Sequence, residues 1–350
     1  MNKTNYFNER DEKNYNKILK IVNNLPEFCQ NFFISIESTT SPLTRLNYAY
    51  DLRLFFLYLI DNLEKFKNIN SISEFTIKDF IKITSLDIEK YLSWLNVYYN
   101  NDKKHFNHEK GKSRKLSAVK SLFKFCFQKD LIESDISQKV STPKLHDKPI
   151  IRLEPEEMVQ VLDEVAVKQG FNVHQQKYIS NTKFRDEAIF YLFLGTGIRI
   201  SELVGLDEDD INFDQNSFRV TRKGGNSTIL YFTDEVKEKL IAYLPERNAI
   251  LKEYSESVNA FFVSLQKKRI STRAVQNIVK KFTQVAVPLK NITPHKLRST
   301  FGTNLYRETN DIYMVATLLG HKDINTTRKH YAAISDDMKR EATKNIKLKN

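Results

Sequence analysis

The feature that most constrains the fold of this chain is a segment near its middle that carries prolines and lacks an apolar face. The segment covers residues 136–157, reads ISQKVSTPKLHDKPIIRLEPEE and contains three prolines. Proline lacks the backbone N–H donor, and it disfavours the helical conformation in the residue before it. We therefore expect an extended linker over residues 136–153 that separates two domains. A length of 350 residues also favours two domains.

The chain before the linker has the periodicity of helices. Apolar residues recur at spacings of three and four, and no alternating pattern typical of strands precedes residue 140. The helical stretches are YNKILKIVNNLPEFCQNFFISI, LTRLNYAYDLRLFFLYLI, SLDIEKYLSWLNVYY and KLSAVKSLFKFCF. Ser41 before Pro42, and Ser85 with Asp87, supply side-chain acceptors that can start the second and third helices. The sequence thus predicts a domain of four main helices over residues 1–135.

The chain after the linker mixes helical and strand patterns. Helices are predicted at 155–166, 184–194, 234–244, 271–286, 294–307 and 311–318, with shorter ones near 324–332 and 335–346. Two alternating runs, NSFRVTR and STILYFT, flank the turn KGGN and predict a β-hairpin. The predicted class is mainly α with a small antiparallel β-sheet. We expect a second domain over residues 154–334 and a C-terminal helix or tail over 335–350.

The charge balance favours a polyanionic partner. Lys and Arg number 55 against 43 Asp and Glu, which gives a net charge of +12 and points towards nucleic acid. Six cations lie along the start and one side of the last helix of the first domain: Lys110, Lys112, Arg114, Lys115, Lys120 and Lys124. Such a row can neutralise phosphates, although a solvated helix face has the same pattern.

The sequence disfavours a secreted, membrane-spanning or metal-binding protein. The polar N-terminus lacks the apolar core of a secretory signal, and the longest apolar runs, at 55–60 and 188–194, are far shorter than the ~18–20 residues of a membrane span. We expect a cytoplasmic protein without a membrane partner. Cys29 and Cys126 form no CxxC pair and are expected to be reduced core residues. No acidic cluster or His/Cys spacing predicts a metal site, so no cofactor is expected.

One tyrosine near the C-terminus has companions suited to phosphodiester chemistry. Tyr331 lies in NTTRKHYAA, and phosphoryl transfer needs a nucleophile, cations for the phosphate oxygens and groups that move protons. Arg199 in LGTGIRISELVGL and Arg298 in TPHKLRSTFGT offer planar forks for two-point contact with phosphate. His295 precedes Arg298 by three residues, so both project from one helix face and His295 can accept the phenolic proton.

Two further residues complete the set, and each has a structural alternative. His321 in LLGHKDINTT can donate another hydrogen bond, and Lys223 in the hairpin turn can protonate a departing 5′ oxygen. Lys223 could equally serve only solubility, and Arg199 could form an ordinary ion pair with Glu202. A histidine and an arginine three apart also occur on many structural helices.

The ordered series TGIRISELVGL, a hairpin lysine, TPHKLRSTFGTNL, LLGHKDINTT and a terminal tyrosine resembles the tyrosine recombinase family, also called phage-type integrases. The resemblance covers residues 154–340, and the N-terminal helices are similar in kind to the family's core-binding domain. It implies a two-domain, C-shaped clamp around double-stranded DNA. It also implies a nucleophile, Tyr331, and a phosphate-activating site supported by Glu202 and formed by Arg199, Lys223, His295, Arg298 and His321.

The resemblance implies a site-specific recombinase, either Xer-like and chromosome-resolving or a mobile-element integrase. Strands would be transferred through a 3′-phosphotyrosyl link without ATP or metal, in a tetrameric synapse in which residues 335–350 dock on a neighbouring subunit. His321 and Tyr331 are ten residues apart, where the family typically has nine, and His330 occupies the usual place. Tyr331 is assigned because no tyrosine follows residue 313 except this one.

Three alternatives remain open at this point. A type IB topoisomerase uses a related catalytic set but relaxes supercoils without exchanging strands. A relative that binds DNA without catalysis could have lost the geometry through the longer spacing before Tyr331. A metal-dependent nuclease could use His295, His321 and His330, and it would lose activity in EDTA.

Overall fold

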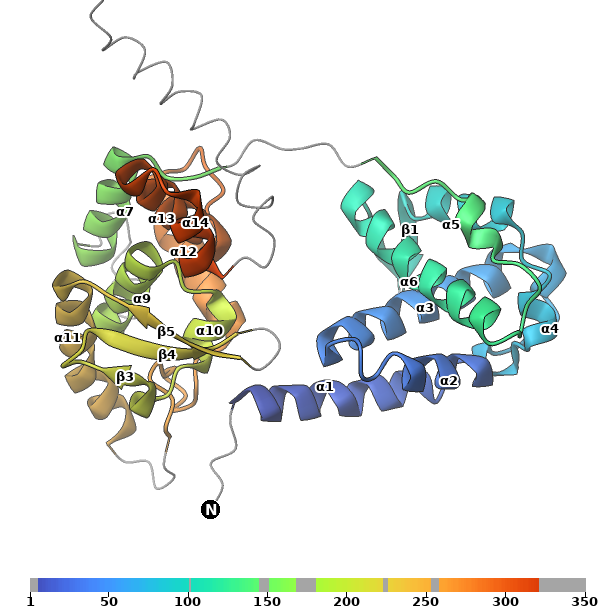
Figure 1. The fold of residues 1–350 in the computed structure, drawn as a ribbon, viewed down its shortest axis with the longest axis horizontal. Coiled ribbons are helices and arrows are strands. Elements are labelled where there is room, and N and C mark those ends of the chain that lie inside the picture. The colour runs from blue at the N-terminus through green and yellow to red at the C-terminus, as the bar shows by residue number, and fades with distance from the viewer. Residues whose placement is uncertain are drawn as a thin grey trace, which may run out of the picture. The chain divides into compact units, whose positions relative to one another are not determined.

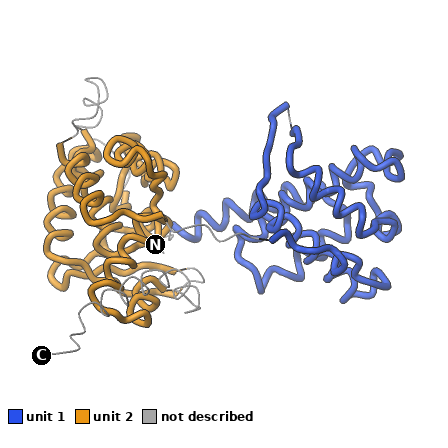
Figure 2. Tube along the Cα trace, turned by 90° about the horizontal axis from the view of Figure 1, so that it is seen from above, with its two compact units in different colours: residues 1–147 blue, residues 148–350 orange. Residues whose placement is uncertain are grey.

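The computed structural model describes residues 6–100, 102–144, 151–167, 181–222, 226–252 and 258–320. The chain divides into two compact units, residues 1–147 and 148–350 (Figures 1 and 2). The point of division lies inside the segment that the prolines marked. Within the described residues, no helix combines the length and the apolarity that crossing a bilayer requires.

The first unit is helical around an aromatic core. Its α-helices are α1 (Tyr6–Val22), α2 (Glu27–Ser35), α3 (Pro42–Asn62), α4 (Ile77–Phe80), α5 (Ser85–Trp94) and α6 (Glu109–Gln128). Short 3₁₀ helices lie at Glu64–Phe66, Ile72–Glu74 and Ile136–Lys139. Phe80 joins elements far apart in the chain, because its ring lies 5.0 Å from that of Phe28 and 4.3 Å from that of Phe123. Ring contacts of this kind join the helices around one core.

Two expectations for this unit were wrong. The first predicted helix is two helices, because Pro26 cannot donate a backbone hydrogen bond and instead precedes α2 as its N-cap. The prediction of no strand before residue 140 also fails, since β1 (Val97–Asn100) pairs antiparallel with β2 (Lys103–Phe106). Asp102 has a φ of 58°, a left-handed conformation that turns the chain back between these strands.

The predicted helix starts were partly right. Ser41 accepts a hydrogen bond from the Thr44 amide at 3.3 Å, as expected for the start of α3. The cap of α5 is Thr84 rather than Ser85: its hydroxyl accepts from the Asp87 amide at 3.3 Å, and Asp87 accepts from the Thr84 amide at 2.8 Å. These reciprocal bonds form a capping box, which satisfies two otherwise unpaired donors.

The linker is shorter than expected, because both of its described ends pack on the units. Val140 is buried in the first unit, and its carbonyl accepts a hydrogen bond from Lys120 Nζ at 2.7 Å. Leu153 is buried in the second unit, where its amide donates to Thr300 Oγ1 at 3.0 Å. The prediction of an extended linker over the whole of 136–153 is therefore wrong at both ends. Residues 145–150 lie outside the described residues.

The second unit combines helices with a three-stranded antiparallel sheet of order β3-β4-β5 (Figure 1). The helices are α7 (Pro155–Val167), α9 (Lys183–Thr196), α10 (Ile200–Gly205), α11 (Asp234–Leu251), α12 (Thr272–Ala286), α13 (Pro294–Thr309) and α14 (Ile312–Leu319). The strands are β3 (Ile211–Asn212), β4 (Ser217–Thr221) and β5 (Ser227–Tyr231), and Glu208–Asp210 is a 3₁₀ helix. The predicted hairpin is confirmed, whereas α10 and β3 were not predicted.

Helix α11 continues past the proline at which its predicted end lay. Pro245 lies inside the helix, which extends to Leu251. The residues that follow the proline are fixed by tertiary contacts: Arg247 Nη2 donates to Val258 O at 2.8 Å, and Glu246 accepts from the amide of Phe184 at 2.9 Å at the start of α9. These bonds offset the cost of proline in a helix interior, which local propensity alone would make prohibitive.

Candidate active site

The site is organised around the C-terminal end of α14. The last carbonyl groups of an α-helix lack partners within the helix and carry the negative end of its dipole. Helix α14 ends at Leu319, and Gly320 follows as its C-cap with a φ of 59°. The side chains of Arg199 and Arg298 both reach these carbonyls.

Arg199 is placed by the sharp break between α9 and α10. Gly197 has a φ of 62°, and a Cβ there would lie 2.4 Å from Phe301 Cδ1, so the position requires glycine. The Arg199 guanidinium then spans two groups: Nη2 donates to Leu319 O at 3.0 Å and Gly320 O at 2.9 Å, while Nη1 donates to Glu202. Its side chain retains 33% exposure. The Gly-Thr-Gly break therefore does aim this arginine.

Glu202 orients Arg199. Its carboxylate is 3% exposed and accepts from Arg199 Nη1 at 2.8 Å and from the Arg199 backbone amide at 2.9 Å. The ordinary ion pair that we held as an alternative is thus present. The same guanidinium nevertheless reaches α14 with its other nitrogen, so pairing with Glu202 and pointing into the site are compatible.

Arg298 comes to the same place from α13. It is 5% exposed, and its two terminal nitrogens donate to Gly197 O and Leu319 O. Leu319 O therefore accepts hydrogen bonds from both arginines. His295 is exposed in the first turn of α13, three residues before Arg298. The structure thus brings Arg199 and Arg298 together, with His295 one helical turn away.

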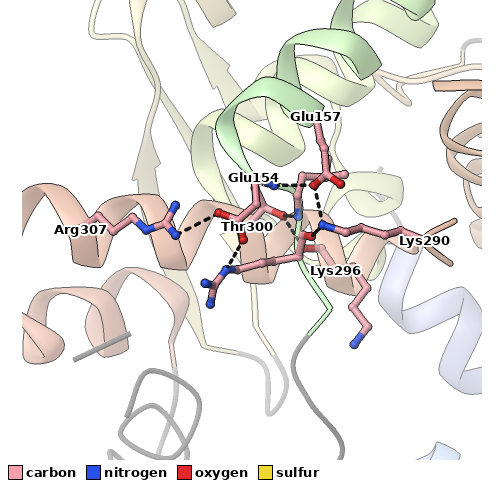
Figure 3. A network of polar contacts seen from close by, with 8 residues as sticks. Glu154, Glu157, Lys290, Lys296, Thr300 and Arg307 are labelled. Atoms are coloured by element: carbon pink, nitrogen blue, oxygen red, sulfur yellow. Dashed lines mark hydrogen bonds and ion pairs between the residues drawn. The ribbon is translucent and has the colours of Figure 1, made fainter. Parts of the chain in front are cut away.

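Helix α13 is fastened to the beginning of the second unit (Figure 3). Thr300 Oγ1 accepts from the Leu153 amide, Arg307 Nη2 donates to Glu154 at 3.0 Å, and Lys290 Nζ donates to Glu157 at 2.6 Å. Burial acts to raise the pKa of Glu154, but hydrogen bonds from Arg307 and Arg152 outweigh it and hold that pKa below its usual value. The network therefore holds the helix that carries Arg298 at Thr300 and Arg307, and it holds the loop before the helix at Lys290.

Lys223, His321, Tyr331 and the segment 335–350 lie outside the described residues. Among the described residues, no group of three or more His, Cys, Asp or Glu side chains is arranged to hold a metal ion.

The row of cations on α6 is not a uniform surface. Lys110 and Lys124 are exposed and Lys112 is half-buried. Lys115 is buried, 3.6 Å from Asp51, and burial lowers its pKa although Asp51 acts to raise it. The prediction that Lys115 contacts DNA is therefore wrong, because this lysine is buried and paired inside the unit.

Two other members of the row also have partners. Arg114 is 45% exposed and donates to Asp51 at 2.5 Å. Burial raises the pKa of Asp51, although Arg114 and Lys115 act to lower it. Lys120 is half-buried and donates to Val140 O. Of the six cations, Lys110, Lys112 and Lys124 remain the ones best placed to meet an external anion.

One residue of the site was missed from the sequence. Arg222 follows β4, and its guanidinium donates to Leu318 O at 3.0 Å, beside the carbonyls that Arg199 and Arg298 occupy. Its position directly before Lys223 was a signal that could have drawn attention to it.

Comparison with known proteins decides the family. The sequence pattern of the phage integrase family matches residues 152–338. The tyrosine recombinase XerC of Caldanaerobacter subterraneus subsp. tengcongensis is 32% identical over 339 residues, covering 95% of this chain and 89% of the relative. The chain belongs to the phage integrase family. XerD of Staphylococcus haemolyticus is 28% identical and covers 85% of this chain and 90% of that protein.

Solved structures of integrases and recombinases share the fold. XerH bound to palindromic difH substrate has a TM-score of 0.64 at 19% identity, covering 87% of this chain and 80% of that one. The lambda integrase(75-356) dimer bound to a COC′ core site has a TM-score of 0.60 at 15% identity, covering 87% and 93%. The resemblance found from the motifs and the predicted class, mainly α with a small antiparallel sheet, are therefore confirmed.

Proposed function

We propose that this phage integrase family member is a site-specific DNA recombinase that cuts and rejoins strands through a 3′-phosphotyrosyl intermediate. The observation that carries the proposal is the meeting of Arg199 and Arg298 at the end of α14. His321 follows that end directly, and Tyr331 follows ten residues later. Two forks that share one carbonyl acceptor are close enough to bind one phosphate group together.

The electrostatics of the site support this role. Two guanidinium ions repel each other, and here the α14 carbonyls and the Glu202 carboxylate offset that repulsion before any substrate arrives. The positive groups are thus held ready where negative charge grows in the transition state. Such preorganised groups stabilise a transition state without reorganising during the reaction.

The proposed chemistry conserves the phosphodiester energy. The Tyr331 oxygen attacks the phosphorus, its proton passes to His295, and the bond from phosphorus to the 5′ oxygen breaks as Lys223 protonates that oxygen. His321 donates a further hydrogen bond to the phosphate. A 5′ hydroxyl of another strand then attacks the phosphotyrosine and reverses these steps. The phosphotyrosyl bond retains the energy of the broken phosphodiester, so the proposed cycle consumes no ATP, and the protein residues supply every proton donor and acceptor.

The relatives support the choice of partner. The structures similar to this chain include XerH bound to difH substrate and a lambda integrase tetramer bound to a Holliday junction. We infer that this chain binds double-stranded DNA in the cytoplasm and forms a tetramer on two sites, with residues 335–350 docked between subunits. Because several relatives are XerC and XerD proteins, the proposal favours an Xer-like enzyme.

A nicked DNA substrate tests the function. Cleavage near the nick releases a short strand, so the protein remains covalently attached through Tyr331. Wild-type protein should accumulate this adduct in EDTA, whereas Tyr331→Phe should bind the same DNA and form none. An adduct formed by Tyr331→Phe would overturn the nucleophile, and no adduct with wild-type protein would favour a relative that binds DNA without catalysis. Relaxation of supercoils without strand exchange would favour the topoisomerase.

A further inference from the structure

The side chain of Arg222 lies across the end of α14. Its Nη2 donates to Leu318 O at 3.0 Å, and its Nη1 lies 3.4 Å from Thr317 O. A Cβ at Gly320 would lie 1.8 Å from Arg222 Nη1, so the guanidinium packs directly on the glycine. Gly320 is thus needed both for its positive φ and for the space that this side chain takes.

Arg222 also belongs to the β4–β5 hairpin. The strand pairing ends with Thr221 opposite Ser227, and the Arg222 amide donates to Asn226 O at 2.8 Å one step further. The three residues between Arg222 and Asn226 begin with Lys223. The same residue therefore closes the paired part of the hairpin with its backbone and binds α14 with its side chain.

The surroundings of Arg222 are costly for a cation. Burial lowers the pKa of its guanidinium, the neighbouring Arg199 lowers it further, and Glu202 acts in the opposite direction. Its Nε is buried without a hydrogen-bond partner among the described residues. An arginine that served only solubility would extend into water, where these costs vanish. The contacts with α14 are what retain the side chain here.

We propose that Arg222 is a positioning residue that fastens the β4–β5 hairpin to the end of α14. The hairpin leads into Lys223 and the end of α14 leads into His321. The contact therefore joins the described residues that precede these two segments, beside Arg199 and Arg298. The inference rests on the proposed function, in which Lys223 protonates the departing 5′ oxygen. Arg222 itself acts through Lys223 and does not touch the reacting atoms.

The physical reason is the short reach of proton transfer. A general acid must come within about 2.6–3.2 Å of the atom it protonates, and a misplacement of about 1 Å can cost 100-fold in rate. Strand β3 pairs with β4 only at Ser217 and Phe218, at the end away from the turn, so a contact at Arg222 restricts the positions of the residues that follow. Arginine presents two terminal nitrogens in a rigid fork that matches two neighbouring carbonyls, whereas lysine offers a single ammonium group on a flexible stem.

The test compares two leaving groups on the nicked substrate. One substrate carries the ordinary 5′ oxygen, and the other carries a bridging 5′ sulfur, whose thiolate departs without needing a proton. Arg222→Ala should cleave the ordinary substrate about 100-fold more slowly than wild type and the sulfur substrate within about threefold of it. Lys223→Ala should show the same pattern, and Arg199→Ala should be slow on both substrates.

The controls separate this role from a general structural one. Arg219→Ala removes the same charge from the same hairpin, at a side chain 61% exposed and paired with Asp210, and it should cleave both substrates normally. If Arg222→Ala does not fold by circular dichroism, Arg222→Lys takes its place, with a smaller loss on the ordinary substrate and the same rescue by sulfur.

Two results would overturn the proposal: normal cleavage of the ordinary substrate by the Arg222 variant, or equal slowing on both substrates. Neither would harm the proposed function, which fails only if the wild-type protein forms no adduct with either substrate.

Discussion

Glu202 shows how a single residue determines the direction of Arg199, an arginine of the candidate active site. Its carboxylate binds both the backbone amide and the guanidinium of Arg199, so it fixes the side chain at two points. The other terminal nitrogen, Nη2, is then directed to Leu319 O at the end of α14. A hydrogen bond that involves a charged group contributes roughly 1.5–3 kcal/mol.

Replacing the carboxylate by an amide should therefore weaken catalysis more than binding. Glu202→Gln keeps the shape of the side chain but removes the charge that holds Arg199, and we expect adduct formation to slow by about 10- to 100-fold. Single-turnover cleavage measures this rate, and an electrophoretic shift measures DNA binding, which should change by less than about threefold. An unchanged rate would show that the α14 carbonyls suffice to orient Arg199.

The two cysteines illustrate the opposite case, residues that only pack. Both are free and buried, as expected from their apolar surroundings. Burial raises the pKa of Cys126 to about 12 and also raises that of Cys29, so neither thiol ionises near neutral pH. We expect no reaction of either residue with an aromatic disulfide reagent until the protein is unfolded in guanidinium chloride. Rapid labelling of the native protein at pH 8 would contradict this.

Helix α5 shows that the start of a helix can depend on a residue distant in the sequence. Asp87 accepts hydrogen bonds within its capping box and also from Lys65 Nζ at 2.5 Å. Burial acts to raise the pKa of Asp87, but the bonds from Lys65 and Thr84 outweigh it, and the pKa is lowered. The folded state therefore favours the ionised carboxylate.

This shift predicts how stability depends on pH. Since the folded pKa is below the unfolded value of about 3.9, the stabilisation is complete above that value and is lost as pH falls through the folded pKa. Asp87→Asn should lower the free energy of unfolding by about 1 kcal/mol at pH 7, and the difference from wild type should vanish in acid. Urea unfolding at several pH values measures it. A difference that persists at pH 2 would assign the effect to packing.

The whole molecule carries a net charge of +12 on two units that the chain joins through a segment rich in proline. Lysine and arginine side chains that contact phosphates release counterions from the DNA, so the affinity for DNA falls as the salt concentration rises. In the first unit, Lys110 and Lys124 of α6 are exposed and Lys112 is half-buried, whereas Lys115 is buried beside Asp51. Burial thus divides one row of cations into members that solvent reaches and structural members.

The three members that solvent reaches should determine the salt dependence. Changing Lys110, Lys112 and Lys124 together to Gln should reduce the slope of log K against log salt by up to about 3. Lys17, Lys20 and Lys90 are exposed elsewhere in the same unit, and changing them to Gln removes the same charge. Fluorescence anisotropy measures both slopes between about 50 and 300 mM salt, a range in which such losses of affinity are measurable. Equal slopes for the two variants would reject α6 as a DNA contact.

Local patterns predicted much of this protein because they report interactions between neighbours in the chain. Spacings of three and four predicted the long helices, the alternating runs predicted the β4–β5 hairpin, and Gly197 marked the break that aims Arg199. The spacing of three residues also placed His295 and Arg298 on one helix face, since both lie within one turn of α13. These features depend on backbone geometry that a few adjacent residues set.

What escaped prediction depends on residues that meet only after the chain has folded. Arg222 and Thr317 are 95 positions apart, and Arg114 and Asp51 are 63 apart, so no window of sequence contains either pair. The same holds for the contacts that carry α11 past Pro245. Burial and charge pairing between distant elements decide whether a cation is structural, positioning or free for a phosphate, because desolvation is a property of the packed molecule and not of the local chain.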